Sequence, residues 1–334
     1  MMSDRSRIQR GALASVLGLV CLGAVSMTGQ TPAKPASPRT PWGDPDLQGT
    51  WFVLADVPLE RSAANAGKEF LTDAEVAAAD EKKGLNPGRN ARAADKSQDV
   101  SGAYNAVFNS VLKTGKRTSM ITDPPDGKIP PLVPGASQTA RAGFAGLGLG
   151  NGAGQNDNPE TVPQSPRCLG VPMPFLPLNT LFAQGTVMQV VQAPKSMGIY
   201  MEDDHAGGGN RVIFIDGSPH LPSKLKFFLG DSRGHWEGNA LVVETTNFSQ
   251  GFRGSNIETY KMIERFTRVD ANKLRREITF DDPKTWTKPW TVVIEMGRAP
   301  SERHMIFDSA CHEGNYGMTG LLVGTRKEEQ AGKK

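Results

Sequence analysis

Short apolar segments separated by turn signals fill the C-terminal half of the chain, and this pattern constrains the fold more than any other feature. The segments favour strands, and the turns between them include Asp216-Gly217 and Glu237-Gly238-Asn239. Because no helical pattern lies between them, a parallel α/β sheet is disfavoured. We therefore predict an all-β fold, an antiparallel barrel or sandwich. The predicted strands cover residues 187–191, 196–201, 212–215, 240–245, 259–269, 274–280, 291–296 and 304–310, with one more near Trp51.

The N-terminal half of the chain is rich in loop-forming residues. The whole chain contains 37 Gly, 24 Pro and 38% hydrophobic residues, so much of it is expected to be irregular. We predict one domain at 42–326, with a mostly irregular wrap at 53–185, the main strands at 186–316 and a disordered tail at 327–334. One short helix is predicted at 72–82, where Thr72 and Glu75 can form a capping box.

The first residues have the layout of a secretory signal peptide. Arg5, Arg7 and Arg10 precede an uncharged apolar run at 11–27, and Ala24 and Ser26 offer small residues for cleavage. We predict a signal peptide at 1–28 and a disordered linker at 29–41; a membrane anchor is the alternative interpretation. The prediction implies a periplasmic or secreted protein with no membrane attachment after cleavage.

Cysteine usage fits an oxidising compartment. Cys21 would leave with the signal peptide, so Cys168 and Cys311 would remain. An even number of cysteines in an exported protein predicts one disulfide between them. Two buried free thiols are the alternative.

Charge and histidine spacing exclude several functional classes. The net charge is +3, of which the signal peptide carries most, and no block of like charges occurs, so we expect no nucleic-acid partner. None of the five histidines has the short paired spacing of a zinc motif. We predict no cofactor and no metal; the alternative is a metal site assembled from His205, His220 and His312.

Alternation along 259–269 places Tyr260, Met262, Glu264 and Phe266 on one face, and their size indicates that this face points inward. A hairpin to the next strand would set Arg276 diagonal to Glu264. A buried carboxylate is costly unless it is paired or protonated. Glu264 therefore either forms a structural ion pair with Arg276 or lines a polar cavity.

A second group of polar residues lies close to Cys311. Asp308 and His312 are four residues apart, too far to hydrogen-bond along a straight strand, and a bend near Cys311 would be needed to join them. Asn315 follows in the same segment and could face the mouth of the barrel together with Asn247. A disulfide would hold the backbone here in place.

Six segments of the chain resemble those of an uncharacterised family of bacterial secreted proteins. They are PWGDPDLQGTW (41–51), RTSMITDPPDGKIPPL (117–132), DGSPHLP (216–222), GDSRGHWEGNALVVETTNF (230–248), ERFTRVD (264–270) and ACHEGNYGM (310–318). The resemblance implies export and a chain that forms one unit, without an established activity. Gly49 and Trp51 also resemble the Gly-x-Trp start of lipocalin-type barrels, although the long segment 53–185 departs from a minimal lipocalin.

Three functions are compatible with these patterns. The first, slightly favoured by polar residues on inward faces, is a hydrolase, lyase or isomerase acting on a small organic molecule; its acid and base groups would be His312, Asp308, Glu264 and His220, of which at least two must converge. The second is a lipocalin-like carrier without catalysis, and the third is a structural protein without a ligand. The carrier predicts Glu264 paired with Arg276 and a pocket of large side chains. The expected ligand-binding residues are Tyr260, Met262, Phe266, Arg276, Asn247 and Asn315, with Phe280 added to the pocket lining.

Overall fold

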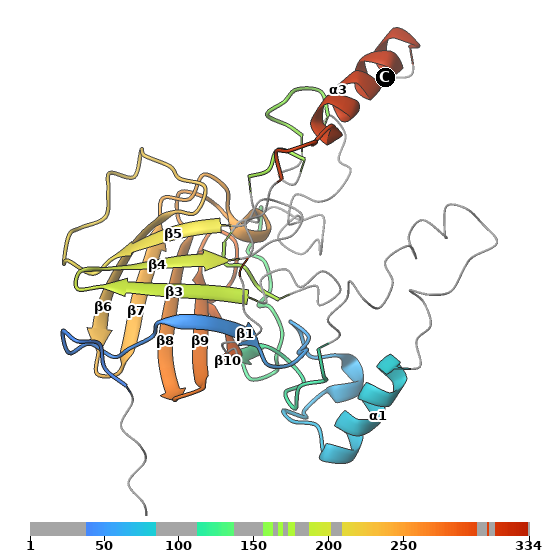
Figure 1. Cartoon of the computed structure of the whole chain (residues 1–334). Helices are drawn as coiled ribbons and strands as arrows, with labels where there is room; N and C mark the ends of the chain where they lie inside the picture. Colours follow the sequence, from blue (N-terminus) through green and yellow to red (C-terminus); the bar gives the residue numbers. More distant parts are fainter. Residues whose placement is uncertain are drawn as a thin grey trace, which may run out of the picture. The chain divides into compact units, whose positions relative to one another are not determined.

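Nine strands form a closed ring in the structure of the chain, a computed structural model (Figure 1). Around the ring the order is β1, β3, β4, β5, β6, β7, β8, β9 and β10, and β1 pairs with β10 to close it. The short β2 pairs with β10 as a tenth strand. The strands are β1 (Gly49–Val53), β2 (Ile121–Asp123), β3 (Val187–Ala193), β4 (Ser196–Met201), β5 (Gly209–Phe214), β6 (Asp231–Glu237), β7 (Ala240–Thr246), β8 (Lys261–Asp270), β9 (Lys273–Asp281) and β10 (Trp290–Arg298).

The structure describes residues 38–84, 112–136, 156–162, 166–169, 173–177, 187–201, 209–298, 306 and 311–332. They belong to the second of two units, Ala36–Lys334. The first unit, Met1–Pro35, lies outside the described residues, and so do the predicted signal peptide and most of the predicted linker. Among these described residues, the α-helices are α1 (Asp73–Gly84) and α3 (Gly317–Gln330). Within the described ranges, no helix has the length and apolar character needed to cross a bilayer.

The predicted all-β barrel is confirmed, and the ring closure excludes the sandwich. Seven of the eight strands predicted by range overlap observed strands, and the turn Glu237-Gly238-Asn239 joins β6 to β7 as a hairpin. Strict alternation of buried and less buried residues along β8 and β9 explains why the sequence pattern predicts these two strands well. The predicted helix is α1, and its capping box is present: the Glu75 amide donates to Thr72 Oγ1 at 3.3 Å, and the Thr72 amide donates to Glu75 Oε2 at 2.8 Å.

The pairing of β5 with β6 corrects the predicted antiparallel order. These strands are parallel and share only two register pairs, Ile213 with Ser232 and Phe214 with Arg233. The cause is the long connection at residues 215–230. It is not a hairpin, and it carries the chain back to the level of the last residues of β5 before β6 begins. The barrel is therefore mixed, and the sequence pattern missed β6 because its segment DSRGHWE has no apolar alternation.

The C-terminal end differs from its prediction. Helix α3 extends to Gln330 and so replaces the first part of the tail predicted at 327–334. Of the strand predicted at 304–310, only Ile306 lies among the described residues, and it belongs to no strand.

Candidate functional site

Glu264 lies inside the barrel with 0% of its surface exposed. Arg276 on β9 donates to its Oε1 from Nε at 2.9 Å and from Nη2 at 2.7 Å. On the other side, Arg211 of β5 forms an ion pair with Oε2. The register sets Glu264 opposite Ile278 and Phe266 opposite Arg276, which confirms the predicted diagonal pair. Of the two interpretations of Glu264, the ion pair is the one observed.

The remaining donors of both guanidinium groups have neutral partners. Arg211 donates to Ser232 Oγ at 2.8 Å and to Thr245 Oγ1 at 2.6 Å. Arg276 donates to the carbonyl of Pro174 at 2.7 Å and to that of Phe175 at 3.4 Å. These carbonyls come from residues 173–177, a buried segment outside the strands. Backbone thus occupies the side of Arg276 that faces away from Glu264.

The charges of this cluster do not cancel. Two guanidinium groups face one carboxylate, so the cluster of Arg211, Glu264 and Arg276 carries a net charge of +1. Burial alone would raise the pKa of Glu264, but the charges of Arg211 and Arg276 and their hydrogen bonds lower it overall. Burial also lowers the pKa of Arg211, while Glu264 opposes that effect. Glu264 is therefore an ionised counter-charge rather than a proton donor at neutral pH.

An apolar pocket with a volume of about 190 Å³ lies beside β1 and β10. β1 leaves the ring after Val53, and the amide of Leu54 still donates to Glu295 at 3.1 Å. Farther along β10, the amide of Val293 donates to Met120 at 2.9 Å. The pocket thus lies where β10 passes from one neighbouring segment to the next. Its lining residues are Val53, Leu54, Ala55, Val57, Gly115, Lys116, Arg117, Met120, Pro177, Val293, Ile294 and Glu295.

One residue of the pocket lining stands next to the charged cluster in the sheet. Ile294, which lines the pocket, is the direct register partner of Arg276, and directly opposed side chains of one face lie about 5 Å apart at Cβ. Both residues are buried, at 3% and 2% exposure. Pro177, also in the lining, ends the segment whose carbonyls contact Arg276. The three charged residues of the lining are already paired, Lys116 with Asp73, Arg117 with Glu69 and Glu295 with Arg275.

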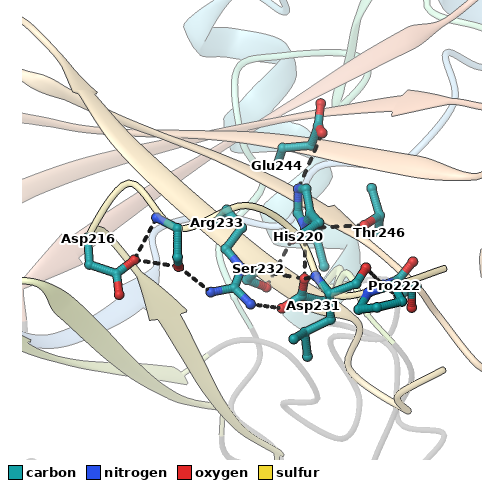
Figure 2. Close-up of polar contacts among 12 residues, drawn as sticks. Asp216, His220, Pro222, Asp231, Ser232, Arg233, Glu244 and Thr246 are labelled. Carbon is teal, nitrogen blue, oxygen red and sulfur yellow. Dashed lines mark hydrogen bonds and ion pairs between the residues drawn. The ribbon is translucent and has the colours of Figure 1, made fainter. Parts of the chain in front are cut away.

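His220 lies on the opposite side of the barrel wall from Glu264. Its Nδ1 is 2.9 Å from Asp231 Oδ2, and its Nε2 is 3.3 Å from Glu244 Oε1 (Figure 2). Asp231 and Glu244 point outward, because the next residues along the chain, Ser232 and Thr245, are a register pair that faces inward. His220 and Glu264 therefore do not converge, as the enzyme hypothesis would require.

Asp231 holds the connection between β5 and β6 against the barrel. Its Oδ2 accepts the amide of Leu221 at 2.8 Å, and its Oδ1 accepts Arg233 Nη2 at 2.8 Å. Arg233 also donates to Ser218 Oγ at 2.7 Å, so Figure 2 shows a continuous chain of contacts from the loop to β6. Burial would raise the pKa of Asp231, but hydrogen bonds from Leu221, His220 and Arg233 lower it overall. The arrangement is that of a structural clamp.

We expect the stability contributed by Asp231 to disappear in acid. Its pKa is lower in the folded protein than the unfolded value of about 3.9, so its contribution is complete above that value and declines as pH falls through the folded pKa. Asp231→Asn should be less stable at pH 6 and should lose less stability between pH 6 and the acid range. Urea unfolding of both proteins as a function of pH measures this difference. Parallel curves would contradict the assignment.

Asn247 and Asn315, the two asparagines predicted at the mouth of the barrel, donate hydrogen bonds to backbone carbonyls. Asn247, with φ 58°, donates from Nδ2 to the carbonyl of Leu221 at 2.9 Å. Asn315 donates from Nδ2 to the carbonyl of Pro166 at 2.9 Å. The predicted disulfide Cys168–Cys311 is present, with a Cα–Cα distance of 5.6 Å, and Asn315 also contacts Cys168 Sγ at 3.0 Å.

Of the remaining predicted polar residues, the structure describes only His312. His312 is exposed in the segment after Cys311, whereas Asp308 and His205 lie outside the described residues. In the part of the chain that the structure describes, no group of three or more His, Cys, Asp or Glu side chains could hold a metal ion. The catalytic roles of His312 and Asp308 remain predictions.

The predicted pocket lining is core packing. Met262 and Phe280 are fully buried, Phe266 is 1% exposed, and Tyr260 is 3% exposed. Tyr260 packs against Phe248 with ring centroids 5.0 Å apart, and Phe280 stacks on Trp290 at 4.0 Å. The inward direction of these residues is confirmed, whereas their role as ligand-binding residues stays a prediction; none of them lines the pocket beside β1.

Sequence reasoning missed Arg211 and the pocket. No sequence signal identifies Arg211 as an inward residue: on β5 the apolar Val212 and Phe214 are exposed, whereas Arg211 shares the buried face with Gly209 and Ile213. The pocket had no such signal, because its walls come from four separate segments.

No protein-family model matches the chain, and no curated protein matches it. Among solved structures, a mutant of the fluorescent protein UnaG is similar to part of the chain, with 13% sequence identity and a TM-score of 0.24. The match covers 44% of this chain and 90% of UnaG. The closed strand ring itself, rather than this similarity, establishes the barrel fold.

Proposed function

We propose that the chain is an exported barrel protein that binds a small, largely apolar molecule and does not catalyse a reaction on it. The observation that carries the proposal is the pocket of about 190 Å³ beside β1 and β10. An apolar cavity of about 150 Å³ is enough to hold one benzene molecule. The pocket therefore suits an aromatic ring or a short branched chain rather than a large lipid.

Two further observations favour binding over catalysis. Glu264 is paired with Arg276, as the carrier hypothesis predicts, and His220 lies on the other face of the wall. The apolar leader pattern and the disulfide both support export, because disulfides persist in oxidising compartments. We further propose that the chain is a member of the uncharacterised bacterial secreted family that its motifs resemble.

Filling the pocket is the direct test. Ala55 lines it and is small, so Ala55→Phe should occupy the space and weaken binding of toluene and indole by about tenfold or more. Ligand-observed NMR gives the affinities, and a ligand at about ten times its Kd should stabilise the unchanged protein by about 1.4 kcal/mol.

The matched control is Ala78→Phe, which adds the same ring to an exposed position on α1. This variant should bind both compounds like the unchanged protein. Circular dichroism and the melting temperature establish that both variants are folded. If neither compound binds the unchanged protein, or if both variants bind them equally well, the pocket is not a ligand site.

A further inference from the structure

We propose that the ligand is a small organic acid whose apolar part fills the pocket and whose carboxylate binds Arg276. This inference rests on the proposed function and names its ligand class. Its starting point is the position of Ile294, which lines the pocket and stands directly opposite Arg276 on the inward face. Through Ile294, the pocket lining adjoins Arg276 in the sheet.

The charge of the cluster selects an anion. Arg211 and Arg276 share the single carboxylate of Glu264, which leaves a buried net charge of +1. A buried excess charge is costly, and a second carboxylate would neutralise it. A neutral or cationic ligand would gain nothing from this charge.

The carboxylate of the ligand would take the position of the backbone carbonyls that contact Arg276 in this structure. The carbonyls of Pro174 and Phe175 accept from Nη2 and Nη1, and the second of these hydrogen bonds is long, at 3.4 Å. Two neutral carbonyls are weaker acceptors than a carboxylate, which can receive two parallel N–H groups of one guanidinium. The acid would displace these carbonyls, and Pro177, which ends the same segment, lines the pocket through which it arrives.

A pair of probes with the same shape tests the ligand class. Isothermal titration at pH 7 compares 3-phenylpropanoate with 3-phenylpropanamide, which differ in charge but hardly in size. We expect the acid to bind the unchanged protein about tenfold or more tightly, because hydrogen bonds to charged groups exceed those to neutral ones by this order. In Arg276→Gln the two probes should bind within about twofold of each other.

Two more variants separate charge from folding. Arg276→Lys keeps the net charge and should retain part of the preference for the acid. Arg265→Gln removes an exposed guanidinium from the outer face of β8 and should leave the preference intact. The melting temperature of each variant shows whether it is folded. If Arg276→Gln does not fold, the preference for the acid is compared between Arg276→Lys and the unchanged protein.

The outcomes distinguish this inference from the proposed function. Equal affinity of the unchanged protein for acid and amide would overturn the inference and leave the pocket as a ligand site. Binding of toluene without binding of either probe would have the same meaning. A preference for the acid that persists in Arg276→Gln would also overturn it. If toluene, indole and both probes all fail to bind, the proposed function falls as well.

Discussion

Glu264→Gln is expected to lower the free energy of unfolding by about 3–5 kcal/mol, because removing one partner of a buried ion pair leaves the other charge uncompensated. Here the loss concerns two partners at once. Arg211 and Arg276 are almost fully buried, and Glu264 is the carboxylate that both contact. Glutamine keeps the volume of the side chain but not its charge, so the two guanidinium groups would face each other.

Urea unfolding followed by circular dichroism measures this loss, with Glu277→Gln as the control. Glu277 lies on the same hairpin but points outward, where it pairs with Arg275 at 3.4 Å. Exposed ion pairs contribute about 1 kcal/mol or less, so the control should change little. Equal losses in the two variants would show that the buried cluster has no special role in stability.

Replacing both Cys168 and Cys311 with alanine is expected to reduce the free energy of unfolding by about 2–5 kcal/mol. The disulfide joins residues 143 positions apart. In the chain-entropy account, a link across so long a loop restricts the unfolded chain strongly, and its removal stabilises the unfolded state. The folded barrel should keep its secondary structure, because neither cysteine belongs to a strand of the ring.

The same measurement on the unchanged protein under reducing conditions provides the control. Reduction removes the link without changing any other atom of the side chains' surroundings, so reduced protein and double variant should unfold at similar urea concentrations. A double variant as stable as the oxidised protein would contradict the expectation. A double variant whose circular-dichroism spectrum lacks the β-sheet signal of the native protein would show instead that the disulfide is needed for folding.

The charged pair Glu264–Arg276 was predictable because it depends on local rules. Alternation places every second residue of β8 and β9 inward, and a short turn fixes the register between them. The partner Arg211 was not predictable, because it lies on β5, which is far from β8 along the ring and contacts Glu264 only across the barrel interior.

Asn247 shows the same limit for polar residues in loops. Its position after β7 is clear from the sequence, but the hydrogen bond from its side chain to the carbonyl of Leu221 is not. Which loop returns to which strand depends on the path of residues 215–230, and this path also makes β5 and β6 parallel. Turn signals specify where a strand ends, whereas the return of a long connection depends on packing across the whole molecule.

The sequence by itself determined the all-β class, the capping box of α1 and the inward face of β8 and β9, since alternation and capping act between residues close in the chain. The disulfide followed from counting cysteines within an expected compartment. Only the tertiary structure decided the closed ring, the pairing of Arg211 and Arg276 with one carboxylate, and the pocket beside Ile294. These features arise from segments far apart in the chain, and their contacts exist only once the barrel has closed.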